Sequence, residues 1–294
     1  MNLVFEPLDI GRQLDYGQAL TACPQKTSDY AFANVWGWGE HYGLTWAFGH
    51  GLAWLAQTRG ESALWAPVGD WEGTDWRALA PLLSGRTFIR VPERLALLWR
   101  EAFGGAVALF ECRDHFDYVY SVPELVGLKG NRFHKKKNLL AQFQKQYAFE
   151  YKPLTPECVD DVLQMQADWQ RWHEVASEAL VAENRAIERV LTDFDRITCL
   201  TGGTIRINGR VAAYCVAECL GQDSLVIHFE KGDTAYKGVY QAINQMFLAH
   251  AGTGFAYVNR EQDLGDAGLR KAKLSYNPVL FLKKFKAVFR RAAP

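Results

Sequence analysis

One stretch near the C-terminal end, residues 225–278, constrains the fold more than any other part of the chain. Its first segment, 225–230, is rich in β-branched and aromatic residues that alternate as in a strand. A loop that ends at Gly238 leads into 239–249, where apolar residues recur at helical spacing. Residues 255–259 form a second strand-like segment. This order of strand, loop, helix and strand predicts an α/β unit with a binding site at the strand ends.

The loop before the predicted helix has the features of an anion site. Gly238 stands at the helix start, where unpaired backbone N–H groups and the helix dipole attract negative charge. Lys231 and Lys237 add positive charge, and Tyr236 lies between them. The loop therefore predicts a cradle for a phosphate or carboxylate. The alternative is an ordinary strand–helix loop with solvated lysines.

Polar side chains gather where the two predicted strands end. In the first strand, His228 and Glu230 share one face. The second strand is followed by Asn259, Arg260, Glu261 and Asp263. Glu230 and Glu261 can take a proton from an amine, directly or through water, or bind a cationic amine. Alternatively, each carboxylate is paired with a nearby cation such as Arg260 or Lys273.

The length of 294 residues exceeds the usual size of one domain and predicts two. The first half is predicted to run strand, helices, three-strand meander, helix, strand, helix, strand, and the second half repeats that order. The expected fold class is α/β (α+β), with two tandem units, each a mixed, mainly antiparallel sheet flanked by helices. We place the units at residues 1–146, which end in a basic helix at 129–146, and 147–294, which carry the predicted site.

Some predicted elements are specific enough to be tested one by one. We expect strands at 3–5 and 279–285, and a helix at 74–83. Asn208 and Gly209 are the strongest two-residue hairpin signal in the chain.

Charge is balanced over the whole chain but uneven along it. The 33 basic and 33 acidic residues cancel, so the composition as a whole does not indicate nucleic acid or an anionic membrane. The basic helix at 129–146, with Arg132 and Lys136, and the basic C-terminal tail, with Lys271 and Lys273, are exceptions. These surfaces can hold the phosphates of a transfer RNA or of a lipid headgroup, and a solvated helix face explains such runs equally well.

The six cysteines are scattered, lack the paired spacing of a zinc site and indicate no disulfide framework. No apolar run reaches the length of a membrane span, and the N-terminus lacks the basic region of a signal peptide. The expected location is therefore the cytoplasm, and the oligomeric state is left open.

Four segments carry a resemblance to a known family: 28–34 (SDYAFAN), 128–138 (LKGNRFHKKKN), 259–265 (NREQDLG) and 268–278 (GLRKAKLSYNP). With them the chain resembles bacterial stand-alone proteins related to the C-terminal catalytic domain of phosphatidylglycerol lysyltransferases. It is more distantly similar to the Fem peptidoglycan aminoacyltransferases. The resemblance covers nearly the whole chain and implies two tandem domains of the GCN5-related acetyltransferase (GNAT) fold, the second of which retains the site.

The resemblance implies that an aminoacyl group moves from charged transfer RNA to an amine or hydroxyl acceptor, which is a small molecule, a lipid or a peptide. Two alternatives are open: an N-acyltransferase that uses acyl-coenzyme A, and a non-catalytic pair of domains that binds a ligand or partner. None of these requires a tightly bound cofactor.

The resemblance also implies roles for particular residues. Acetyltransferases of this fold often place a general acid after the last helix, where this chain has Tyr276; a lone tyrosine is more commonly a packing residue. The predicted catalytic residues are Glu230, Glu261 and Tyr276. The predicted binding residues are Lys231, Tyr236, Lys237, Gly238, Asn259, Arg260, Asp263, Lys271, Lys273, Arg132 and Lys136.

Overall fold

The computed structural model describes residues 3–172 and 177–291, and its contacts divide the chain into two compact units. Unit 1 consists of the chain up to Asp117, the segment Gln262–Asp266 and the part from Phe281 onward. Unit 2 consists of Tyr118–Glu261 and Ala267–Leu280.

These bounds differ from the division at residue 147 that the repeated element order suggests. Strand β8 (Asp117–Ser121) belongs to the N-terminal half of the sequence but pairs within the sheet of unit 2. Strand β15 (Lys284–Phe289) lies near the C-terminus but pairs within the sheet of unit 1. A single cut in the sequence therefore cannot separate the two units.

The sheet of unit 1 is mixed, with eight described strands in the order β1-β2-β3-β4-β6-β15-β7 and with β5 paired to β3. Strands β4 and β6 are parallel, and the other described pairs are antiparallel. Its strands besides β15 are β1 (Glu6–Pro7), β2 (Leu44–Gly49), β3 (Leu52–Gln57), β4 (Ala63–Trp65), β5 (Val68–Gly69), β6 (Thr87–Pro92) and β7 (Val107–Glu111). Tryptophans dominate its core, and the fully buried ones are Trp46, Trp54, Trp65, Trp71 and Trp99.

Helix α5 (Glu93–Phe103) shows how the helices of unit 1 are specified. It buries Leu95, Ala96 and Trp99 at helical spacing and ends at Gly104, whose positive φ of 50° favours glycine. The other helices of this unit are α1 (Gln13–Ala22), α2 (Phe32–Gly37), α3 (Gly39–Tyr42) and α4 (Ala80–Leu83), with 3-10 turns at Ile10–Arg12, Ser28–Tyr30, Gly104–Ala106 and Arg113–His115.

The sheet of unit 2 has seven described strands in the order β14-β8-β13-β12-β11-β10-β9. Strands β9 to β12 are antiparallel neighbours, whereas β12 and β13 are parallel and are connected through a helix. Its strands besides β8 are β9 (Glu150–Pro153), β10 (Leu200–Ile207), β11 (Arg210–Cys219), β12 (Ser224–Gly232), β13 (Tyr257–Asn259) and β14 (Leu280–Leu282).

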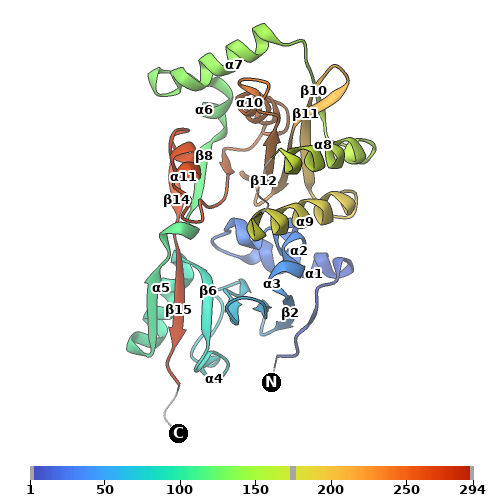
Figure 1. The fold of residues 1–294 in the computed structure, drawn as a ribbon. Helices are drawn as coiled ribbons and strands as arrows, with labels where there is room; N and C mark the ends of the chain where they lie inside the picture. Colours follow the sequence, from blue (N-terminus) through green and yellow to red (C-terminus); the bar gives the residue numbers. More distant parts are fainter. Residues whose placement is uncertain (1–2, 173–176, 292–294) are drawn as a thin grey trace. The chain divides into compact units, whose positions relative to one another are not determined.

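Helices lie on both faces of the unit 2 sheet (Figure 1). Helix α10 (Val239–Ala251) packs on β10, β11 and β12, and α8 (Val159–Arg171) packs on β11 and β12. Neighbouring residues of β11 separate the two faces: Cys215 lies in the core with α10, and the Tyr214 hydroxyl donates to Gln166 of α8 at 2.5 Å. The other helices are α6 (Val122–Gly127), α7 (His134–Gln146), α9 (Glu178–Thr192) and α11 (Ala267–Leu274), with 3-10 turns at Asn131–Phe133 and Pro156–Cys158.

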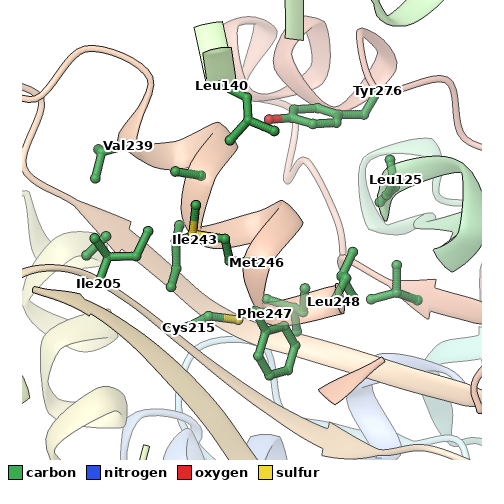
Figure 2. Close-up of a cluster of buried hydrophobic side chains, with 14 of the residues drawn as sticks. Leu125, Leu140, Ile205, Cys215, Val239, Ile243, Met246, Phe247, Leu248 and Tyr276 are labelled. Carbon is green, nitrogen blue, oxygen red and sulfur yellow. The ribbon is translucent and has the colours of Figure 1, made fainter. Parts of the chain in front are cut away.

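The core between α10 and the sheet is continuous with α7. Figure 2 shows Ile243, Met246 and Phe247 of α10 above the sheet, and Tyr276 beside Leu140 of α7. The basic helix predicted at 129–146 forms as α7 and the turn before it, and its buried apolar residues are Phe133, Leu140 and Phe143. Helix α7 is therefore part of the fold of unit 2 and not a linker.

The specific element predictions have mixed outcomes. The Asn208–Gly209 hairpin turn is confirmed, with positive φ at both residues, 51° and 78°. The single strand predicted at 279–285 is wrong: β14 pairs in the sheet of unit 2, and β15, which begins two residues after it ends, pairs in that of unit 1. The helix predicted at 74–83 is shorter, since only α4 (Ala80–Leu83) is helical. The strand predicted at 3–5 does not form there, and β1 begins at Glu6. Strand β7 was not predicted.

The expected fold class is confirmed, because each unit is a mixed, mainly antiparallel sheet flanked by helices. None of the helices formed by the described residues combines the length and the apolar character that a membrane span needs.

Gly238 is required by a close backbone contact, which yields a testable prediction. Its φ is +90°, and a Cβ there would lie 2.4 Å from the carbonyl oxygen of Leu139 in α7. Gly209 also has a positive φ, +78°, but no atom lies within 4 Å of its added Cβ. We expect Gly209→Ala to lower the free energy of unfolding by about 1–2 kcal/mol, the backbone cost alone. Gly238→Ala should cost at least about 2 kcal/mol more, since the steric overlap is added.

Urea unfolding followed by tryptophan fluorescence measures both losses. Equal losses in the two variants would contradict the close approach of α7 to Gly238.

Candidate functional site

The parallel strands β12 and β13 stay together for three residue pairs: Ser224 with Tyr257, Leu225 with Val258 and Val226 with Asn259. Beyond them, β12 continues beside β11 to Gly232. The chain after Asn259 instead follows β8, where the Arg260 N–H donates to the carbonyl of Tyr118 and the Tyr118 N–H donates to the carbonyl of Glu261. Because the two segments pair with different neighbours, they separate, and polar residues of both lie near the point of separation.

A β-bulge sends the polar residues of β12 to opposite faces of the sheet. The pairing with β11 shifts between Val216 and Ala217, so that His228 is an extra residue in β12. The prediction that His228 and Glu230 share one face is wrong, because the extra residue breaks the alternation of side chains. Glu230 points to the α10 side, and His228 to the α8 side.

On the α10 side, Glu230 anchors a partly buried arginine. One carboxylate oxygen of Glu230 accepts from Nη2 of Arg260 at 2.8 Å, and the other accepts from Nδ2 of Asn244 at 2.8 Å. The Arg260 guanidinium lies over the rings of Tyr276 and Tyr120, 4.7 and 5.7 Å from their centroids. With both oxygens engaged, Glu230 is placed to hold Arg260 rather than to take a proton from a substrate.

The guanidinium of Arg260 is charged but incompletely hydrogen-bonded. Burial opposes its charge, yet the carboxylate of Glu230 outweighs burial and raises the pKa of Arg260 above its ordinary value. Its Nη1 is buried and has no hydrogen-bond partner among the described residues. Buried donors are normally paired, so this nitrogen needs an explanation.

The ring of Tyr276 carries a second cation. Nζ of Lys136 lies 3.9 Å from the ring centroid, and burial together with the charge of Arg260 lowers the pKa of Lys136. The Tyr276 hydroxyl accepts from Nε2 of Gln241 at 3.2 Å. Burial raises the pKa of Tyr276, so that the phenol keeps its proton at neutral pH.

On the α8 side, His228 lies between two carboxylates. Its Nδ1 is 3.0 Å from Oε1 of Glu261, and its Nε2 is 3.3 Å from Oε2 of Glu218. Burial favours the neutral imidazole, but the hydrogen bonds to Glu218 and Glu261 outweigh it and raise the pKa of His228 to about 9. At neutral pH both ring nitrogens therefore donate, and two carboxylates face one imidazolium. The His228 side chain is fully buried, whereas 20% of the Glu261 side chain is exposed.

The pKa of His228 predicts that stability depends on pH. Because folding raises this pKa from 6.5 to about 9, the stabilisation is complete below pH 6.5 and is lost as the pH rises towards 9. We expect the urea midpoint to fall over this range, and to fall less in His228→Asn. The exposed His134 supplies a control, since His134→Asn should keep the wild-type dependence. An unchanged dependence in His228→Asn would contradict the pairing of His228 with the two carboxylates.

The backbone at Glu261 is held in an uncommon conformation. Its φ of 58° is left-handed, which residues other than glycine seldom adopt. The Glu261 N–H donates to Oδ1 of Asn259 at 2.8 Å, and Asn259 is buried. Asn259 therefore positions the turn that places the Glu261 carboxylate against His228, and strain of this kind is common at functional sites.

Several backbone N–H groups at the loop before Gly238, where an anion cradle was predicted, already have acceptors in the protein. Five backbone N–H groups in or beside it already donate to protein acceptors: those of Asp233, Ala235, Tyr236, Lys237 and Val239. The carbonyl of Leu139, which carries partial negative charge, also packs on Gly238. A diphosphate at this loop would have to displace these contacts.

Two of the three loop side chains that were predicted to bind the anion, Lys231 and Tyr236, have partners elsewhere. Lys231 is buried, and its ammonium lies 2.7 Å from the carboxylate of Glu183 in α9, so it points away from the loop. Tyr236 packs edge-on against Tyr147, with ring centroids 5.2 Å apart, and Lys237 is exposed.

The other predicted binding residues are divided between the α10 side and the surface. Nζ of Lys273 donates to the backbone carbonyl of Arg260 and so belongs with the α10-side cluster. Lys271 is exposed on α11, and Arg132 forms an ion pair with Glu124. Of the predicted set, the structure therefore brings together Glu230, Arg260, Tyr276, Lys136 and Lys273 on one face, and Glu261 and Asn259 on the other.

Asp263, which was also predicted to bind, belongs to unit 1. Its buried carboxylate lies 3.2 Å from Nη1 of Arg113 and accepts from the N–H of Gly265 at 2.9 Å.

Unit 1 contains a buried charge cluster that the sequence analysis did not identify. Nζ of Lys284 contacts the carboxylates of Asp29 and Asp117, and the distance to Asp117 is 2.6 Å. Arg90 forms a second ion pair with Asp29, and Ser28 donates to Asp117 through its N–H and its hydroxyl, each at 2.8 Å.

Two of the resemblance segments meet in this cluster. Ser28 belongs to the segment 28–34, and Gln262 belongs to 259–265. Nε2 of Gln262 donates to the hydroxyl of Ser28 at 2.8 Å and to Asp117 at 3.0 Å. At least part of the shared sequence pattern therefore serves the fold of unit 1.

Three site residues were not considered, namely Glu218, Asn244 and Gln241, and His228 was noted as a polar strand residue but not predicted to be catalytic or binding. Two of the three had a signal in the sequence, because Glu218 follows the apolar run 211–217 of β11 and Asn244 lies next to Ile243 on the buried side of α10. A buried polar residue in an apolar element normally has a polar partner.

The fold and the two polar clusters define an α/β protein with charged groups where two parallel strands of one sheet separate. The chain matches the family described as phosphatidylglycerol lysyltransferase, C-terminal, over residues 21–288 and belongs to that family. The resemblance inferred from the sequence is thus confirmed.

Comparisons with individual proteins agree with this assignment. A protein of Mycoplasmoides gallisepticum is 25% identical over 181 residues, or 58% of this chain, and the match spans about half (54%) of that protein's length. A crystal structure of a conserved protein of unknown function from Bacteroides thetaiotaomicron is 28% identical with a TM-score of 0.91, and the match covers 98% of this chain and 100% of that one.

More distant structures share the fold. The C-terminal domain of a putative lysylphosphatidylglycerol synthetase from Agrobacterium fabrum is 14% identical with a TM-score of 0.69, and the match covers 95% of this chain and 92% of that one. FemX is 8% identical with a TM-score of 0.61 and 96% coverage of both chains. At these identities the likeness shows the fold alone.

Proposed function

We propose that this protein is an aminoacyltransferase that moves an aminoacyl group from charged transfer RNA to an amine or hydroxyl acceptor. The observation that supports this most is the pair of polar clusters at the separation of β12 and β13, in a member of the phosphatidylglycerol lysyltransferase family. A purely structural protein has little reason to bury charged groups at the end of a parallel strand pair.

The chemistry divides between the two faces of the sheet. The acceptor amine meets Glu261 on the α8 side and attacks the ester carbonyl of the donor, which approaches from the α10 side. Glu261 takes the amine proton while the His228 imidazolium holds its carboxylate in place. The ester C–O bond breaks, and Tyr276, which keeps its phenolic proton, protonates the leaving ribose oxygen. Arg260 supplies positive charge beside the developing oxyanion.

The loop before Gly238 makes acyl-coenzyme A the weaker candidate for the donor. A coenzyme A diphosphate needs unpaired N–H groups at this helix start, and five N–H groups there already have protein acceptors. The basic segment that contains α7 offers a different phosphate-binding surface, with Arg132 and Lys136 among its residues.

A transfer assay tests the proposal. The purified protein is incubated with transfer RNAs charged with labelled amino acids, or with labelled acyl-coenzyme A, and with lipid, peptide and small amine acceptors. We expect label to pass from charged transfer RNA, and transfer RNA binding to weaken steeply with salt, with a flatter slope after charge reversal of Lys135, Lys136 and Lys137 together. Salt-insensitive binding of an acyl-coenzyme A, without affinity for charged transfer RNA at low salt, would overturn the choice of donor.

A further inference from the structure

Three consecutive lysines of α7 differ in what surrounds them. Lys135 and Lys137 are exposed, whereas Lys136 is partly buried with its ammonium over the ring of Tyr276. The packing of unit 2 therefore fixes where Lys136 lies, whereas the other two lysines are surface charges on the same helix.

The surroundings of Tyr276 carry more positive than negative charge. Lys136 and Arg260 both lie over this ring, at 3.9 and 4.7 Å from its centroid. Glu230 is the carboxylate that pairs with Arg260, and both of its oxygens are already engaged. Lys136 has no ion-pair partner among residues 3–172 and 177–291. Two cations thus share one carboxylate, and at least one positive charge is not balanced locally.

The unbalanced charge coincides with an unused hydrogen-bond donor. Arg260 uses Nη2 for Glu230, while its buried Nη1 has no partner in the described part of the chain. A guanidinium presents its N–H groups as a rigid fork that matches the oxygens of a phosphate. A bound anion would supply the acceptor that this buried, charged N–H lacks, and it would also balance the charge of the second cation.

We infer that Lys136, Arg260 and Tyr276 form a binding site for the phosphodiester group of a substrate. One phosphate oxygen accepts from Nη1 of Arg260, and a second accepts from the ammonium of Lys136, whose long side chain rotates off the ring to admit the anion. A phosphodiester carries one negative charge, which balances the excess charge at Tyr276. The carrier of this phosphate is assigned through the proposed function: it is the headgroup of a phospholipid acceptor or the 3′ end of the transfer RNA.

Binding measurements without any reaction test the site. Isothermal titration of the whole protein with glycerophosphoglycerol, with a short RNA that ends in CCA, with inorganic phosphate and with acetate separates the sources of the anion. We expect one of the two phosphodiesters to bind, and acetate to bind at least tenfold more weakly. Lys136→Met should weaken the phosphodiester about tenfold or more, the loss of one charge-assisted hydrogen bond, whereas Lys135→Met and Lys137→Met should change it less than twofold.

Arg260→Lys provides a second variant, since it keeps the charge and loses the fork. It should weaken binding of the phosphodiester although the charge is kept, because the Nη1 donor is lost. Equal effects of the three lysine variants would reduce the site to diffuse surface charge and overturn the inference, as would binding of neither phosphodiester. Transfer from charged transfer RNA with phosphodiester binding unaffected by Lys136→Met would leave the proposed function intact and remove this site. Phosphodiester binding that Lys136→Met weakens, in a protein that transfers no aminoacyl group, would support this site and contradict the proposed function.

Discussion

Replacement of Lys284 by methionine is expected to lower the free energy of unfolding by about 3–5 kcal/mol, which is the usual cost of removing one partner of a buried ion pair. The ammonium of Lys284 is fully buried between the carboxylates of Asp29 and Asp117. Burial disfavours a charged Asp29, but Lys284 and Arg90 outweigh it and hold the pKa of Asp29 well below its usual range. Without Lys284, Asp29 keeps its ion pair with Arg90, and Asp117 loses the ammonium group and keeps the hydrogen bonds from Ser28.

A neighbour on the same strand supplies the matched control for this prediction. Lys286 also lies in β15 and pairs with Glu61, but the two side chains are 37% and 50% exposed. Lys286→Met should therefore cost about 0–1 kcal/mol. Adding Asp117→Asn to Lys284→Met removes one uncompensated charge and should recover part of the loss. Urea unfolding measures all three variants, and equal small losses in Lys284→Met and Lys286→Met would show that the cluster contributes little.

Local sequence patterns were sufficient to predict most elements of unit 2. The apolar spacing of 239–249 predicts α10 to within two residues of its observed end, because one face of that helix is buried along its whole length. The Asn208–Gly209 pair predicts a turn whose positive φ values these residues tolerate. Such features are local, so one segment of sequence contains all the information about them.

Strand exchange between the halves was not predictable in this way. Relative to the division at residue 147, β8 lies in the first half of the sequence but pairs in the sheet of unit 2, and β15 lies in the second half but pairs in the sheet of unit 1. Pairing partners far apart in the sequence are chosen by the fit of the whole sheet, and single-strand patterns do not contain that choice. The division at residue 147 follows from element order alone and misses both exchanges.

The sequence was sufficient to predict where the candidate site lies, but not on which face of the sheet each side chain lies. The charged residues at the strand ends were identified, yet the bulge at His228 separates Glu230 from Glu261 by placing them on opposite faces. An extra residue in one strand is defined only against its partner strand, and the residues of β12 alone give no sign of it. As a result, Glu230 and Glu261, which were both expected to take a proton from the amine, have different surroundings.

Glu261→Gln is expected to lower the rate of aminoacyl transfer about 10²–10⁴-fold, the usual contribution of a general base. The substitution keeps the size of the side chain and one hydrogen bond to His228, so the fold should persist and the transfer RNA affinity should change little. Glu157→Gln, at an exposed position, is the matched control and should leave the rate unchanged.

A second measurement on the same variant links the reaction to the buried imidazolium. Glu261 is one of the two carboxylates that raise the pKa of His228, so Glu261→Gln should lower that pKa and weaken the fall in stability between pH 6.5 and 9. Full transfer activity together with this weaker pH dependence would show that Glu261 pairs with His228 without taking the amine proton. Loss of activity with an unchanged pH dependence would mean that the carboxylate acts on the substrate but is not held by His228.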